Sequence, residues 1–252
     1  MKITKSQVQL LHSPGDEQLV DVQPQAGGLR AFVTLNMMTD EGIEGIGLTF
    51  APGLGLSPLA PSLKTMVEAL CELTEGEDPM ETESVMQGLR DKTNGSGPGG
   101  MLTLALAAVD MALWDIKGKA LNQSVCSLLG GYRKRVPTYA SGALMRPMNL
   151  EQLAEIGPAL VQKGFKQMKS QMGAEDTPAK EVMRMRTLRE AVGEDIDIMC
   201  DINQMWNVNQ AITIGSRVEE YNLFWLEDVV AHDDYQGLAR VADALNTPIA
   251  AG

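Results

Sequence analysis

Three polar side chains in the second half of the sequence, Lys169, Asp201 and Glu227, have the types and the spacing expected of an active site. Each lies near the end of a strand-like run, and helical patterns separate these runs, which cover residues 165–171, 196–203 and 223–228. Asp201 follows Lys169 by 32 residues, and Glu227 follows Asp201 by 26. This regular alternation of strand-like runs and helical patterns predicts parallel strands joined by helices, with the three side chains at one edge of the sheet.

Two carboxylates on neighbouring strand ends suit a hard divalent cation such as Mg²⁺, which takes oxygen ligands. A cation there would polarise a substrate carboxylate and stabilise the enediolate formed when an α-proton is removed. The ammonium form of Lys169 would be disfavoured beside that cation, so Lys169 could act as a base near pH 7. The alternative is that Asp201 and Glu227 cap the helices that follow them or pair with basic residues.

Two amide side chains are expected next to these charged groups. Because alternate residues of a strand share a face, Gln171 is expected on the face of Lys169. Asn203 is expected on the face of Asp201 for the same reason.

The two histidines, His12 and His232, are weaker candidates. His12 falls in a Gly/Pro-rich segment, residues 12–28, that predicts a loop, and His232 follows the strand that ends near Glu227. A lone histidine in a loop is more often exposed to solvent than catalytic. The absence of HExxH, GxSxG and CxxC patterns argues against zincin, serine-hydrolase and thioredoxin-like chemistry.

The composition narrows the class of protein. Apolar residues make up 44% of the 252, enough to bury a sizeable core, and the net charge of −12 disfavours nucleic-acid binding. Neither a signal sequence nor an apolar run long enough for a membrane helix is present in the sequence. The three cysteines are far apart, which predicts reduced, buried thiols and a cytoplasmic protein.

The elements that would position the chemistry fall into two parts. Alternating patterns within residues 2–50 predict a small antiparallel meander, and residues 101–121 predict the strongest helix, with Asp115 and Lys119 as an ordinary i,i+4 pair. From residue 136 onward, five strands alternate with helices. Periodicity allows an open sheet or a barrel, and the strand-end chemistry favours a barrel. Since closure needs eight strands, a closed barrel cannot be built from this sequence alone.

Three motifs together resemble the mandelate racemase/muconate lactonizing enzyme family of the enolase superfamily. Residues 107–119, AAVDMALWDIKGK, are similar to its signature helix. Residues 201–206, DINQMW, and 225–228, WLED, resemble its first and second metal-ligand motifs.

The resemblance implies an α/β fold: an α+β capping domain over residues 1–133, with two mobile loops near 12–28 and 51–58. Residues 134–252 would then hold about the first five strands of a (β/α)7β barrel. It also implies Mg²⁺-assisted abstraction of the α-proton of a small carboxylate substrate by a homo-oligomeric enzyme. By position, Asp201 and Glu227 would be metal ligands and Lys169 the first lysine of a Lys-x-Lys strand. Asn203 would be the polar residue beside the metal.

Two departures from the family pattern matter. The second lysine of the motif is Gln171, which cannot abstract a proton. Either Lys169 or a group outside this chain must then act as the base, or Gln171 only binds substrate. An acid-sugar or hydroxy-acid dehydratase, which can work with one acid–base group, is therefore favoured over a racemase, epimerase or cycloisomerase. In the family, the third metal carboxylate follows a strand like residues 248–252, so we expect this chain by itself to be an inactive, incomplete barrel.

Overall fold

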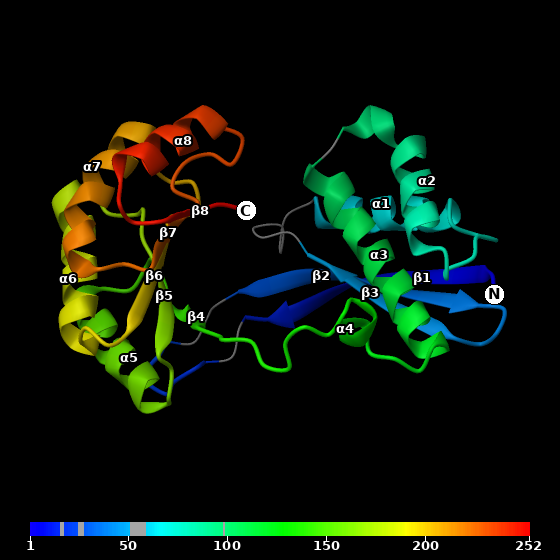
Figure 1. Ribbon diagram of the computed structural model, residues 1–252, viewed down its shortest axis with the longest axis horizontal. Helices are drawn as coiled ribbons and strands as arrows, with labels where there is room; N and C mark the ends of the chain where they lie inside the picture. The colour runs from blue at the N-terminus through cyan, green and yellow to red at the C-terminus, as the bar shows by residue number, and fades with distance from the viewer. Residues whose placement is uncertain (16–17, 25–27, 51–58, 98) are drawn as a thin grey trace. The chain divides into compact units, whose positions relative to one another are not determined.

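The structure is a computed structural model that describes residues 1–15, 18–24, 28–50, 59–97 and 99–252. It divides into two compact units (Figure 1). The first comprises Met1–Gly15 and Gly27–Arg135, and the second comprises Asp16–Ala26 and Val136–Gly252. Residues 16–26 thus group with the second unit, although they lie far from it in the sequence. The loop expected at residues 51–58 lies outside the described residues.

The first unit contains the antiparallel meander expected from the sequence. Its strands pair in the order β1-β2-β3, with bounds β1 (Ile3–Pro14), β2 (Leu29–Thr39) and β3 (Glu44–Thr49). The expectation that His12 lies in a loop is wrong, because β1 continues to Pro14 and pairs His12 with Ala31.

The helical segments that follow the meander are α1 (Ala60–Glu72), α2 (Thr82–Lys92), the 3-10 turn η1 (Asn94–Ser96), α3 (Gly100–Ala120) and α4 (Val125–Leu128). Of these, α1 and α3 pack on the sheet, and α2 and α4 contact α3. The strongest helix expected from the sequence is α3. Its alanines and leucines pack with the inward residues of β2 in one buried cluster that includes Val33, Leu35, Ala105, Ala112 and Leu113.

Asp115 and Lys119 on α3 form the predicted i,i+4 pair, at 2.7 Å, and they also close the free edge of β3. Asp115 Oδ2 accepts the backbone N–H of Ile46 at 2.8 Å. Lys119 Nζ donates to the carbonyl of Glu44 at 2.7 Å. An unpaired strand edge invites other strands to pair with it, so this pair protects the meander.

Two glycines of β3 allow α3 to approach the sheet closely. A Cβ built on Gly47 would overlap the carbonyl oxygen of Ala108, and one on Gly45 would overlap that of Ala112. Both obstacles are backbone atoms, so a larger residue would have to move the whole helix.

We expect Gly47→Ala to lower the free energy of unfolding by about 2 kcal/mol, because overpacking a rigid contact costs roughly 1–3 kcal/mol. Gly88 on α2 has no atom within 4 Å of its would-be Cβ, so Gly88→Ala is the matched control. It should stabilise the protein by about 0.5–1 kcal/mol through helix propensity. Urea denaturation of both variants checks the pair, and a Gly47→Ala protein as stable as the unmodified chain would contradict the packing described.

The second unit is a five-stranded parallel sheet in the order β4-β5-β6-β7-β8. Figure 1 shows its helices following one another along the same side of the strands. The strands are β4 (Ala140–Leu144), β5 (Gln167–Gln171), β6 (Asp197–Asp201), β7 (Trp225–Glu227) and β8 (Ile249–Ala250). The helices are α5 (Leu150–Gln162), α6 (Pro178–Val192), α7 (Val208–Val218), the 3-10 turn η2 (Glu219–Tyr221) and α8 (Tyr235–Ala244).

The core of this unit lies between the sheet and the helices. Residues of one strand face, such as Met168, Ile198 and Leu226, pack in one buried cluster with helix residues such as Leu153 and Ile214. The opposite strand face carries the polar residues singled out in the sequence.

Two further observations concern membrane-spanning helices and the state of the cysteines. None of the helices in the described part of the chain has the length and apolar character needed to span a membrane. The cysteines Cys71, Cys126 and Cys200 are free, as expected, but Cys126 is exposed rather than buried.

Candidate active site

The parallel register brings the strand-end residues together on one rung of the sheet. Gln171 pairs with Asp201, Asp201 pairs with Glu227, and Glu227 pairs with Ala250. Lys169 lies two residues before Gln171 on β5, so its side chain points to the same face and reaches up to this rung. The carboxyl ends of the strands therefore converge as the spacing predicted.

Lys169 bridges the two carboxylates. Its Nζ lies 3.0 Å from Asp201 Oδ2 and 2.9 Å from Glu227 Oε1. All three side chains are largely shielded from solvent, with exposed fractions of 13% for Lys169, 7% for Asp201 and 24% for Glu227. Burial lowers the pKa of Lys169, but hydrogen bonds and charge from Glu227 and Asp201 outweigh it, so the pKa is raised. These contacts favour the ammonium form, and the neutral base expected beside a cation stays a prediction.

Each carboxylate is also held by a second, neutral donor. Trp225 Nε1 donates to Glu227 Oε2 at 3.0 Å, and the backbone N–H of Asn203 donates to Asp201 Oδ1 at 2.9 Å. Neither carboxylate caps the following helix, because Asn207 and Asp234 occupy those cap positions. The sequence allowed two alternatives to a metal site. Neither carboxylate caps a helix, but both pair with a basic residue, Lys169.

A third carboxylate joins them. Single oxygens of Asp201, Glu227 and Asp228 all lie within 4.8 Å of one another, the one such acidic group among the described residues. Strand alternation would turn Asp228 away from Glu227, but Asp228 has left the strand and has a φ of 49°. This left-handed conformation is uncommon for a residue other than glycine and points to a functional position. In the sequence, Asp228 was only a member of the 225–228 motif, without an assigned role.

Arg146 is a second residue that the sequence did not reveal. It lies in the loop after β4, and its guanidinium crosses the ends of the next two strands. Nε donates to the carbonyl of Met172 at 2.6 Å, and Nη2 donates to the carbonyl of Ile202 at 3.1 Å and to Asn203 Oδ1 at 2.9 Å. Burial lowers the pKa of Arg146, and the charge of Asp201 opposes that shift. Three successive strand-end loops are joined through this one side chain.

The amides of Gln171 and Asn203 face each other beside Arg146. Gln171 Nε2 donates to Asn203 Oδ1 at 3.3 Å, and Gln171 Oε1 accepts the backbone N–H of Arg146 at 3.3 Å. Asn203 is exposed and has a φ of 48°. Both amides therefore lie at the same strand ends as Lys169 and Asp201.

Two buried side chains of α6, Glu181 and Arg184, form hydrogen bonds with the backbone of these loops. Glu181 Oε1 accepts the backbone N–H groups of Gly173 and Glu175, each at 2.9 Å. Arg184 donates to the carbonyls of Met145 and Met148, at 3.3 and 2.6 Å. Burial raises the pKa of Glu181, against its hydrogen bonds from the Glu175 and Gly173 backbone.

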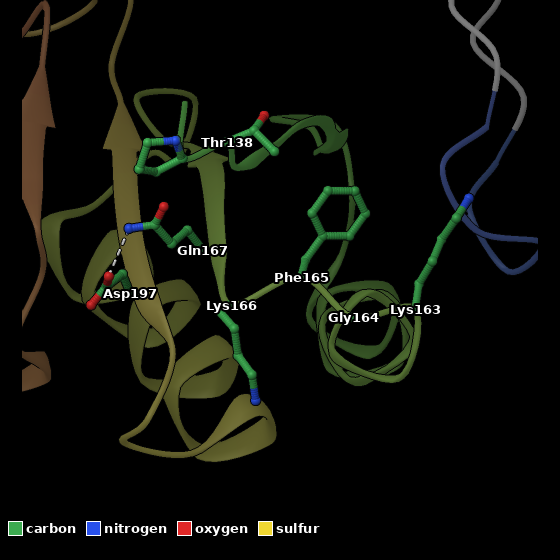
Figure 2. Close-up of a pocket in the computed structure, with 8 residues that line it drawn as sticks. Thr138, Lys163, Gly164, Phe165, Lys166, Gln167 and Asp197 are labelled. Carbon is green, nitrogen blue, oxygen red and sulfur yellow. Dashed lines mark hydrogen bonds between the residues drawn. The ribbon is translucent and has the colours of Figure 1, made fainter. Parts of the chain in front are cut away.

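A cavity of about 580 Å³ lies at the other end of the strands. Figure 2 shows Gln167 and Asp197 at its wall, joined by a 2.8 Å hydrogen bond. These residues begin β5 and β6, four positions before Gln171 and Asp201, which is roughly 13 Å along a strand. The cavity is therefore separate from the carboxylate cluster.

Comparison with known proteins agrees with this geometry. Residues 20–130 match the family model of the mandelate racemase/muconate lactonizing enzyme N-terminal domain, and residues 152–252 match that of the enolase C-terminal domain-like family. The chain belongs to the mandelate racemase/muconate lactonizing enzyme family. Its predicted class, an α+β capping domain followed by the first five strands of an enolase-type barrel, is confirmed.

Proteins similar to this chain include lyases and isomerases. L-talarate/galactarate dehydratase of Salmonella typhimurium is 29% identical over 88% of this chain and 54% of its own length. D-galactarolactone cycloisomerase of Agrobacterium fabrum is 31% identical over 100% of this chain and 65% of its own length. The chain thus spans between half and two thirds of the length of these curated relatives.

A solved racemase from Streptomyces coelicolor with bound magnesium is also similar. It matches 99% of this chain and 69% of its own with a TM-score of 0.89 and 29% identity. The Salmonella dehydratase, crystallised with Mg and L-lyxarohydroxamate, matches 100% of this chain and 64% of its own, with a TM-score of 0.86 and 26% identity.

Proposed function

We propose that this protein is a Mg²⁺-dependent enzyme that removes the α-proton of a small carboxylate substrate, and that it dehydrates an acid sugar or hydroxy acid. The observation that carries the proposal is the convergence of Asp201 and Glu227 on one positive charge, the ammonium of Lys169. The dehydratases among the similar proteins support the reaction class.

The residues present fit a magnesium ion. Asp201, Glu227 and Asp228 offer carboxylate oxygens, the ligands that Mg²⁺ takes in proteins, within a small space. The Lys169 ammonium lies between two of them, and this cationic contact supports the proposal. We propose Asp201 and Glu227 as ligands, as the sequence indicated, and add Asp228 as a candidate. A bound Mg²⁺ would polarise the substrate carboxylate and thereby acidify its α-proton.

The protein's own side chains have separable roles in this proposal. Lys169 is the proposed catalytic residue: it holds a proton and a positive charge at Nζ, where negative charge develops on the substrate. Gln171 and Asn203 are the proposed substrate-binding residues, since their amides can bond hydroxyl groups but cannot abstract a proton. Arg146 orients both amides.

A cycloisomerase is the second candidate, because the Agrobacterium cycloisomerase aligns with the entire chain at 31% identity. Both reactions begin with removal of an α-proton, so the same site serves either. They differ in what leaves the β-carbon: a hydroxyl group in dehydration and a ring oxygen in cycloisomerisation.

The test is a screen of aldonates, aldarates and their lactones with Mg²⁺, followed by NMR in deuterated water. We expect Asp201→Asn to abolish Mg²⁺ binding by calorimetry and, in a protein that carries the complete barrel, formation of the α-keto acid. An opened or rearranged lactone without loss of water would favour the cycloisomerase, and deuterium at Cα of recovered substrate would favour a racemase. An unmodified protein that binds Mg²⁺ no better than Asp201→Asn would refute the proposal.

A further inference from the structure

The two oxygens of the Glu227 carboxylate have different partners. Oε1 lies 2.9 Å from the ammonium nitrogen of Lys169, and Oε2 accepts the indole N–H of Trp225 at 3.0 Å. Asp201 shows the same division, because Oδ2 lies 3.0 Å from Lys169 Nζ and Oδ1 accepts the backbone N–H of Asn203 at 2.9 Å. In each carboxylate, one oxygen therefore faces a positive charge and the other is engaged by a neutral donor.

The register of the sheet places Trp225 where it can reach Oε2. Lys169 pairs with Met199 and Met199 pairs with Trp225, so these three residues form one rung of the sheet. Glu227 lies on the next rung, two residues after Trp225 on β7, and its side chain therefore points to the same face. The ammonium and the indole thus approach one carboxylate from two different strands, β5 and β7, and each binds its own oxygen.

Tyr139, which comes directly before β4, contacts both donors. Its ring centre lies 5.8 Å from that of Trp225 with an interplanar angle of 82°, the edge-to-face arrangement that aromatic pairs favour. The ammonium nitrogen of Lys169 lies 5.9 Å from the centre of the same ring, within the range of a cation–π contact. A packed neighbour restricts rotation of the indole, so Tyr139 helps to keep the indole N–H directed at Oε2.

Divalent cations differ in the way they use a carboxylate. Ca²⁺ takes about six to eight oxygens and accepts both oxygens of one carboxylate, whereas Mg²⁺ requires a nearly octahedral set of ligands. The two oxygens of one carboxylate lie too close together to fill two corners of a regular octahedron. A carboxylate with one oxygen engaged by a neutral donor therefore suits Mg²⁺ better than Ca²⁺.

We infer that Trp225 is a specificity-determining residue for the cation: by engaging Glu227 Oε2, it leaves Oε1 for binding and favours Mg²⁺ over Ca²⁺. The inference rests on the proposed function. Tyr139 is the positioning residue that acts through the indole. The backbone N–H of Asn203 engages one oxygen of Asp201 in the same way, but no side-chain substitution removes it, so the tests use Trp225.

The first test is calorimetric titration with Mg²⁺ and, separately, with Ca²⁺. In Trp225→Phe, the ratio of the two dissociation constants should shift toward Ca²⁺ by at least about fivefold, because Oε2 loses its donor and becomes available. Trp114→Phe is the matched control, since Trp114 is also half-buried but lies on α3 in the first unit, and it should leave the ratio unchanged. A ratio in Trp225→Phe equal to that of the control would overturn the inference.

The second test follows the indole N–H groups by NMR in the unmodified protein. The chain has three tryptophans, and replacing each by Phe in turn assigns their signals. We expect the Trp225 N–H to exchange with deuterium at least about tenfold more slowly than in Glu227→Leu, which lacks the acceptor, and to stay slow when Mg²⁺ is bound. An N–H that becomes fast when Mg²⁺ binds would mean that the cation takes both oxygens, and the inference would be wrong.

The positioning role of Tyr139 is read from the same signal. Tyr139→Leu should speed exchange of the Trp225 N–H, whereas Tyr139→Phe keeps the ring and should leave the exchange rate unchanged. Equal exchange rates in the two variants would remove Tyr139 from the inference.

The inference and the proposed function fail in different ways. If the unmodified protein binds Mg²⁺ better than Asp201→Asn does, but Trp225→Phe does not shift the preference toward Ca²⁺, the inference fails and the proposed function stands. If the unmodified protein binds Mg²⁺ no better than Asp201→Asn, the proposed function is refuted and the role of Trp225 falls with it.

Discussion

Replacing Lys169 with methionine is expected to lower the free energy of unfolding by about 3 kcal/mol in Mg²⁺-free buffer. The side chain of Lys169 neutralises two carboxylates that are mostly shielded from water, Asp201 and Glu227. Removing one partner of a buried ion pair costs roughly 3–5 kcal/mol, and the 24% exposure of Glu227 moderates that cost. The variant keeps a side chain of similar length, so the loss reports charge rather than a large cavity.

Magnesium should reverse that loss. In the unmodified protein, the ammonium of Lys169 occupies the space between the carboxylates, so a cation must compete with it. Without the ammonium, we expect Mg²⁺ to bind at least about tenfold more tightly, which corresponds to roughly 1.4 kcal/mol. A ligand that binds only the folded state stabilises it in proportion to its affinity, so millimolar Mg²⁺ should restore much of the lost stability.

Urea denaturation with and without Mg²⁺, together with calorimetric titration, measures both effects. Lys166→Met is the matched control, because Lys166 is exposed and lies three residues earlier in the chain. It should change stability by less than about 0.5 kcal/mol. A Lys169→Met protein that matches this control, or that binds Mg²⁺ no better than the unmodified chain, would mean that the carboxylates do not form a cation site.

The charged part of the site could be predicted from the sequence, for a physical reason. Parallel strands repeat at a spacing set by one strand and one helix, and their carboxyl ends share an edge. Residue type and position were therefore enough to place Lys169, Asp201 and Glu227 together. The same logic placed Gln171 and Asn203 at that edge.

The protonation of Lys169 could not be predicted in this way. Its pKa depends on which side chains touch Nζ, and the sequence expectation assumed a metal as the nearest charge. The structure instead has Asp201 and Glu227 in direct contact with it, which favours the charged form.

The roles of the loop residues could not be predicted, because contacts made by loops do not repeat with the period of a helix or a strand. Arg146 binds the backbone carbonyls of Met172 and Ile202, and a backbone carbonyl has no signature in the sequence. Asp228 joins the cluster only because its backbone is left-handed. His232 contacts Gln204, which lies 28 residues away in the chain.

Arg146→Met is expected to lower the free energy of unfolding by about 3 kcal/mol and to loosen the loops at the strand ends. The substitution removes the Arg146 donor from the carbonyl of Met172 and one of two donors from that of Ile202, which also accepts the Met205 N–H. Hydrogen bonds to charged groups contribute roughly 1.5–3 kcal/mol each. Arg146→Lys keeps the charge but not the planar set of donors, so it should recover only part of the loss.

Arg186→Met is the control for Arg146→Met, because Arg186 is exposed on α6 and pairs only with Glu190 among the described residues. Its effect should stay below about 0.5 kcal/mol. Hydrogen exchange should show faster exchange at Gly173 and Asn203 in the Arg146 variant and no change there in the control. If the two variants were equally stable and equally protected from hydrogen exchange, the hydrogen bonds of Arg146 would not stabilise the loops. If the expected difference appears, the geometry of Gln171, Asn203 and Gln204 depends on a side chain that holds three loops at once.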